Sequence, residues 1–156
     1  MPISPDAAAA GADGILLLDL PPDEEAENQE MIENSGMKHI RLIAPTTPEA
    51  RMEAIAKSAE GFIYYVSREG VTGAQESLAD TLEDQVAAIR RHTDLPIAVG
   101  FGISKPEHAR QVAAIADGVV VGSAIVKVIE EHGGAPDLEA RVEAFVQPLA
   151  AECARS

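Results

Sequence analysis

The sequence predicts an α/β fold in which five strands, each followed by a helix, form a parallel sheet. Short, continuously apolar runs alternate with longer amphipathic ones, which is typical of parallel strands covered on both faces. The spacings between successive strands are 25, 22, 35 and 22 residues, which fits repeated βα units; they are counted from Ile15, Ile40, Phe62, Ile97 and Val119. The 156-residue length and 46% hydrophobic content suit one domain over residues 1–156.

Five apolar runs mark the predicted strands, because each is short, rich in aliphatic or aromatic residues and bounded by turn-forming residues. They are Gly14–Asp19, Ile40–Ala44, Phe62–Val66, Pro96–Phe101 and Gly118–Gly122. Helical patterns follow the strands, with Gly or Pro near most of their ends. These cover Asp23–Asn34, Pro48–Ser58, Leu78–His92, Pro106–Ile115, Ala124–Glu131 and Asp137–Ala154.

The first residues suggest that the chain starts inside a βα unit. Asp6–Ala10 is rich in alanine and is closed by Gly11, as at the C-terminal end of a helix just before a strand. Such a helix normally begins about a dozen residues earlier and follows a strand of its own. We therefore expect a partial domain.

Composition excludes several classes of function. The chain has 12 basic and 26 acidic residues, a net charge of −14, so binding of nucleic acid or of an anionic membrane is not expected. Cys153 is the only cysteine, which excludes an intrachain disulfide and a cysteine-based zinc site. No apolar run reaches the roughly 18 residues of a membrane span, and Met1–Asp6 lacks the features of a signal peptide. We expect a cytoplasmic protein.

A long interval follows the third predicted strand. Its surplus, residues 67–77, lies at the C-terminal end of the sheet, where α/β enzymes keep their sites. Two glycines and few apolar side chains suit a lid over such a site. The stretch is equally typical of a tolerated surface insertion, and its length alone does not decide between a lid and an insertion.

Two glycine-containing turns in consecutive units are the strongest local signal. Residues 100–104 end the fourth strand, and Ser104 with Glu107 has the spacing of a capping box. Residues 122–124 end the fifth, where Ser123 is placed to cap a short helix. Two such turns match the phosphate site of many (β/α)₈ barrels. The alternative is two ordinary tight turns; the pair favours phosphate binding.

Other polar residues give weaker signals. Asp19 ends the first strand, where it faces the site or bonds the backbone at its turn. Tyr64 or Tyr65 points into the interior, because strand residues alternate between faces. No Ser-His-Asp set, pair of catalytic acids or Walker-type loop can be assembled from spacing. The histidines lack metal-ligand spacing, so we expect them to be solvated and expect no metal; they are His39, His92, His108 and His132.

The chain resembles the α subunit of tryptophan synthase over nearly its whole length. The matching motifs are Ala10–Pro21, Tyr65–Ala74, Gly100–Ser104 and Gly122–Lys127. The glycine turns recur in other phosphate-binding barrels, whereas the Ser-Arg-x-Gly-Val-Thr-Gly loop is far more specific. The resemblance implies a partial TIM (β/α)₈ barrel whose five units correspond to strands four to eight.

The resemblance also implies an activity. The family is a lyase of tryptophan biosynthesis that cleaves indole-3-glycerol phosphate to indole and glyceraldehyde 3-phosphate. It passes indole to a β subunit that holds pyridoxal phosphate, so the β subunit is the implied partner and this chain is expected to need no cofactor.

Individual residues take implied roles from the matched motifs. The implied phosphate contacts are Gly73, Gly102, Gly122 and Ser123. Tyr64 and Phe101 resemble residues lining the indole and glycerol part of the substrate. Thr72 resembles the lid threonine that bonds the catalytic aspartate, and Asp19 resembles an aspartate near the β-subunit contact.

The family's catalytic glutamate and aspartate lie on and after its second strand, which this chain does not resemble. We therefore expect no catalysis by this chain alone, because both the acid that protonates the indole carbon and the carboxylate that holds the indole N–H are missing. We expect a fragment, or a chain that works when a missing half, a second copy or the β subunit covers it. The alternative is a non-catalytic phosphate-binding or β-subunit-interacting module. Another phosphate-binding barrel enzyme, such as a histidine-pathway isomerase, is disfavoured by the Val71–Gly73 loop.

Overall fold

The computed structural model describes residues 5–17, 32, 34–67, 75–100 and 102–154. In these residues five strands form one sheet in the order β1-β2-β3-β4-β5, and every neighbouring pair is parallel. The strands are β1 (Gly14–Leu16), β2 (Lys38–Ile43), β3 (Ile63–Val66), β4 (Ile97–Gly100) and β5 (Gly118–Val120). The helices are α1 (Pro5–Ala9), α3 (Glu49–Ser58), α4 (Gln75–Arg90), α5 (Pro106–Ala113), α6 (Ser123–His132) and α7 (Leu138–Cys153).

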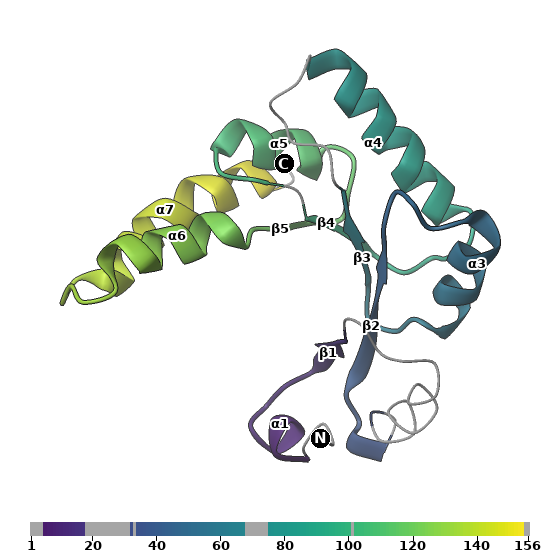
Figure 1. The fold of residues 1–156 in the computed structure, drawn as a ribbon, viewed down its shortest axis with the longest axis horizontal. Coiled ribbons are helices and arrows are strands. Elements are labelled where there is room, and N and C mark those ends of the chain that lie inside the picture. Colours follow the sequence, from purple (N-terminus) through teal and green to yellow (C-terminus); the bar gives the residue numbers. More distant parts are fainter. Residues whose placement is uncertain (1–4, 18–31, 33, 68–74, 101, 155–156) are drawn as a thin grey trace.

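The predicted α/β fold with five parallel strands is confirmed, and the sheet curves as in part of a barrel. Figure 1 shows α3, α4 and α5 on the outer side of this curve, with α6 and α7 extending beyond β5. The helix expected at 23–34 falls almost wholly outside the described residues. Gly11 follows α1 with φ 94°, which agrees with the expected glycine at a helix end.

The outer face of the sheet carries the core. Ile63 and Tyr65 of β3 are at most 1% exposed and belong to a cluster with residues of the neighbouring strands and helices. Tyr64 and Val66, which alternate with them, are only half-buried on the inner face. The continuous apolar runs had predicted strands covered on both faces. In the described residues, the helices cover the outer one.

A partly buried hydrogen bond joins the N-terminal ends of β4 and β5. The Asp117 carboxylate, just before β5, accepts from the backbone N–H of Ile97 at 3.0 Å and from Arg90 of α4 at 2.8 Å. The Asp117 N–H donates to the Ile97 carbonyl at 2.9 Å. These bonds tie α4, β4 and β5 together at the end of the sheet opposite the candidate site.

A second connection lies at β2. Glu60 pairs with Lys38 at 3.1 Å, and its other carboxylate oxygen accepts from the His39 N–H at 3.4 Å. These two bonds, the one to Lys38 first, lower the pKa of Glu60 below its ordinary value of 4.5. His39 itself is 4% exposed, so the expectation that it is solvated is wrong. Its ring lies on the helix-covered face of β2, together with Arg41 and Ile43, because side chains alternate along the strand.

None of the helices in the described ranges is long and apolar enough to cross a membrane.

Replacement of Asp117 tests the connection between strands. Asp117→Ala leaves the Ile97 N–H without its acceptor, and we expect the free energy of unfolding to fall by about 2 kcal/mol. Asp117→Asn keeps the carbonyl acceptor and loses only the half-exposed ion pair, so a loss below about 1 kcal/mol is expected. Urea denaturation of both variants measures the difference. Equal losses would show that the ion pair, not the backbone bond, matters.

Acid titration tests the Glu60 contacts. Because the folded pKa of Glu60 is lowered, its contribution to stability is complete above the unfolded pKa near 4.5 and is lost as the pH falls through the folded pKa. We expect the urea midpoint of the native chain to fall more than that of Glu60→Gln as the pH is lowered from about 6 to well below 4.5. Parallel pH profiles of the two proteins would contradict this.

Candidate phosphate-binding pocket

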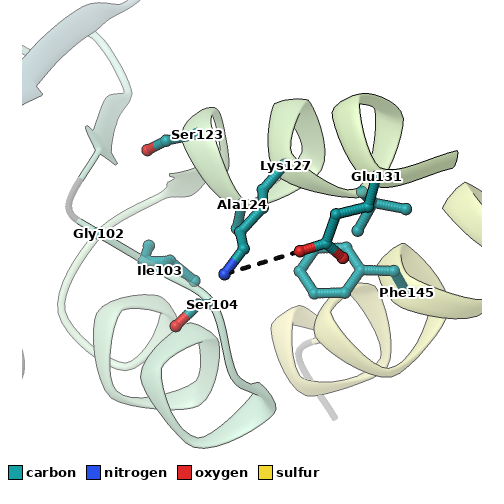
Figure 2. A pocket seen from close by; sticks show the side chains of 9 residues that line it. Gly102, Ile103, Ser104, Ser123, Ala124, Lys127, Glu131 and Phe145 are labelled. Carbon is teal, nitrogen blue, oxygen red and sulfur yellow. Dashed lines mark ion pairs between the residues drawn. The ribbon is translucent and has the colours of Figure 1, made fainter. Parts of the chain in front are cut away.

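A pocket of about 420 Å³ lies between the two glycine turns (Figure 2). The first turn, after β4, contributes Gly102, Ile103 and Ser104. The lining residues from α6 and α7 are Ser123, Ala124, Lys127, Val128, Glu131 and Phe145. The structure thus brings together the two turns that the sequence singled out separately.

The first turn depends on a glycine. Gly102 has φ 47°, in the left-handed region that side chains with a Cβ rarely adopt. The space where its Cβ would lie is open, so the requirement comes from the backbone and not from crowding. Ile103, the next residue, is 2% exposed and fixes the turn to the core. The turn therefore presents a bare backbone to the pocket.

The second turn opens α6. The Gly122 carbonyl accepts the first helical bonds, from the N–H groups of Ile125 at 2.9 Å and Val126 at 3.1 Å. The N–H groups before them, including those of Ser123 and Ala124, have no carbonyl within the helix to bond. No acid lies in the first turn of α6. Unpaired N–H groups and the positive end of the helix dipole favour an anion here.

Both predicted serine caps are wrong. α5 begins at Pro106 with Lys105 as its N-cap, and no side chain caps it, so Ser104 and Glu107 form no capping box. Proline restricts the residue before it to extended backbone, and Lys105 is extended at φ −136° and ψ 152°. Ser123 is the first residue of α6 and not its cap. Both hydroxyls remain at the pocket, which suits ligand binding.

Sequence reasoning missed the four lining residues that lie beyond the two turns: Lys127, Val128, Glu131 and Phe145. Lys127 and Glu131 form an ion pair with an Nζ to Oε1 distance of 3.8 Å (Figure 2). Ser123, Lys127 and Glu131 follow one another at intervals of four residues, which places them on one face of α6. That spacing was the signal available in the sequence.

A second cavity, also about 420 Å³, lies on the concave face of the sheet and is lined in part by Tyr64, Leu16, Ile40 and Val120. Tyr64 thus faces the interior, whereas the Tyr65 hydroxyl bonds Gln85 of α4 on the outer face. A Cβ at Gly100 would overlap the Tyr64 ring, so glycine lets this ring lie against β4, directly before the first glycine turn. The other residues that line the cavity begin or precede β1, β2 and β3, so the cavity extends toward the N-terminal end of the sheet; they are Asp13, Gly14, Lys38, Gly61 and Phe62.

Four residues with implied roles lie outside the described residues: Asp19, Thr72, Gly73 and Phe101. Their roles stay predictions. Of the expected lid, the structure describes Ser67, whose N–H donates to the Gly100 carbonyl at 3.3 Å, and the start of α4 at Gln75. Within the described part of the chain, no group of three or more His, Cys, Asp or Glu side chains is placed to hold a metal.

Comparison with known proteins agrees with the resemblance. The family model described as tryptophan synthase alpha chain matches residues 3–154. Curated alpha chains from Opitutus terrae and Geotalea uraniireducens are 53% and 52% identical over 146 residues, which are 93% and 94% of this chain but 55% and 54% of theirs. The chain therefore spans about half the length of the curated relatives it matches.

Solved structures give the same result. Tryptophan synthase of Mycobacterium tuberculosis is 35% identical with a TM-score of 0.80, over 97% of this chain and 55% of that one. The alpha subunit from Legionella pneumophila is 37% identical with a TM-score of 0.77, over 94% of this chain and 54% of that one.

Alanine at Gly102 tests the geometry of the first turn. We expect Gly102→Ala to lower the free energy of unfolding by roughly 1–2 kcal/mol, because alanine is strained at positive φ. Gly134→Ala is the control, since the space beside Gly134 is also open and its φ is not in the left-handed range. Urea midpoints measure both. A Gly102→Ala protein as stable as the control would contradict the turn geometry.

Proposed function

The chain belongs to the tryptophan synthase alpha chain family, and on this basis we propose that it supplies the phosphate-binding half of a lyase. The proposed reaction is cleavage of indole-3-glycerol phosphate to indole and glyceraldehyde 3-phosphate. The observation that carries the proposal is the pocket in which both glycine turns and the N-terminal end of α6 meet. These groups suit one end of this substrate, its phosphate.

The proposed substrate lies along the C-terminal end of the sheet. Its phosphate accepts hydrogen bonds at Gly102 and Ser123, which line the pocket, and at Gly122, the N-cap of α6. Its apolar part lies on the concave face of the sheet beside the Tyr64 ring, which reaches Gly100. Phosphate binding fixes the substrate, so the scissile carbon–carbon bond is held where an acid and a base can act. Gly73, Phe101 and Thr72 complete the site and its lid in this proposal.

The reaction breaks the bond between indole C3 and the glycerol chain, and a general acid must deliver a proton to C3. The resemblance puts that acid, and the carboxylate that holds the indole N–H, on the family's second strand and the loop after it. This chain binds and orients the substrate, and residues from that other part of the family's barrel complete the catalytic site. The chain needs no cofactor of its own.

A partner and a location follow from the same proposal. The chain acts with a tryptophan synthase β subunit, which holds pyridoxal phosphate and consumes the indole, with Asp19 near the contact. A biosynthetic enzyme of this kind works in the cytoplasm.

Reconstruction of a whole barrel tests the function. We expect a chimaera that joins the unmatched N-terminal part of the Opitutus terrae alpha chain to this chain to release indole from indole-3-glycerol phosphate. This chain alone is expected to release none, with or without β subunit, because the acid is missing. The readout is indole formation.

A matched control is the same chimaera with Ser123→Asp. The added carboxylate lies at the first residue of α6 and repels the phosphate, so KM is expected to rise at least tenfold. A folded chimaera that releases no indole, yet whose chain still binds a glycerol phosphate analogue, would remove the enzyme assignment and leave a binding module.

A further inference from the structure

The phosphate pocket contains a charged pair that the helix itself does not explain. Lys127 lies in the first half of α6, toward the positive end of the helix dipole, and Glu131 lies in the last turn, near the negative end. Both charges are therefore on the unfavourable side of the dipole. Lysine before glutamate is also the weaker order for a pair four residues apart. The pair contributes little to the stability of α6.

The pair is also loose. Nζ and Oε1 are 3.8 Å apart, and the two side chains are 74% and 54% exposed. Solvent screens such a pair, so little is lost when it opens. Figure 2 shows the Lys127 side chain running from α6 towards the turn at Ile103 and Ser104, so its ammonium lies between the two halves of the pocket. Lys127 is thus positioned to exchange Glu131 for another anion.

The net charge of the chain makes a cation at this pocket useful for binding an anion. A net charge of −14 repels a phosphate dianion, and backbone N–H groups supply only partial charges against that field. Of the described residues that line the pocket, Lys127 alone carries a positive charge. A phosphate at the N-terminal end of α6 would lie on the helix face that also carries Lys127.

We propose that Lys127 is a further ligand-binding residue of this pocket. Its ammonium pairs with Glu131 while the pocket is empty and with a phosphoryl oxygen of the substrate when the pocket is filled. Glu131 is a positioning residue that keeps the ammonium at the pocket and competes with the phosphate for it. The inference rests on the proposed function, because it adds a contact to the same phosphate site.

Titration of the 156-residue chain with inorganic phosphate, followed by ³¹P NMR at low salt, tests the contact. Lys127→Met is expected to weaken binding about tenfold, the size of one charge-assisted contact. Glu131→Gln is expected to strengthen it about twofold, because the competing carboxylate is gone. The double variant should match Lys127→Met, since Glu131 acts only through Lys127.

Lys57→Met is the matched control. Lys57 is an exposed lysine paired with Glu53 four residues before it on α3, so its loss changes the net charge equally without touching the pocket. Less than a twofold effect is expected. If Lys127→Met weakens binding no more than Lys57→Met does, the inference is wrong.

One further variant separates this inference from the proposed function. Ser123→Asp should abolish phosphate binding wherever Lys127 points, because it puts a carboxylate at the first residue of α6. Loss of binding in Ser123→Asp with native binding in Lys127→Met overturns only the Lys127 contact. Native binding in Ser123→Asp overturns the pocket itself. Circular dichroism confirms that each variant is folded.

Discussion

The parallel pairing of β4 with β5 is the constraint on which the site depends. Gly100 lies opposite Val120 in this pairing, so the two strands end at nearly the same level. Parallel strands send their chains out at the same edge of the sheet, and the turns that follow therefore lie side by side. Antiparallel pairing would put the glycine turns at opposite edges. The pocket between Gly102 and Ser123 thus follows from strand direction before any side chain is considered.

Small residues on the inner face allow the sheet to curve around the concave cavity. Ala98, Gly100 and Gly118 lie on that face of β4 and β5, and a Cβ at Gly118 would be 3.3 Å from that of Ala98. The outer face of the same strands carries Ile97, Val99 and the larger core residues. The inside of a barrel is narrower than the outside, so small residues inside and large ones outside fit its shape. The bare backbone at Gly100 also makes room for the Tyr64 ring.

The sequence predicted the strands well because each is a short apolar run between turn residues, whereas long-range relations were less accessible. The choice between Tyr64 and Tyr65 depended on which face the helices cover, and only the packing against Gln85 and α4 decides it. His39 was misjudged for the same reason. The capping box failed because the backbone restriction before Pro106 outweighs the preference of Ser104 for capping. Lys127 was missed because its face of α6 lines a pocket only when the turn at Gly102 lies opposite it, and the sequence does not show that proximity.

The first turn of α6 differs in charge from the first turns of α1, α3, α5 and α7. An acid lies in the first turn of α1, α3, α5 and α7; these are Asp6, Glu49, Glu107 and Glu139. Each gains from the positive end of its helix dipole. α6 has no such acid, although the chain is rich in acids, and it carries Lys127 one turn after Ser123 instead. An acid at that end would stabilise α6 and fill the place of an anionic ligand. Its absence costs the helix some stability and leaves the N–H groups at this end of α6 without a carboxylate of their own helix beside them.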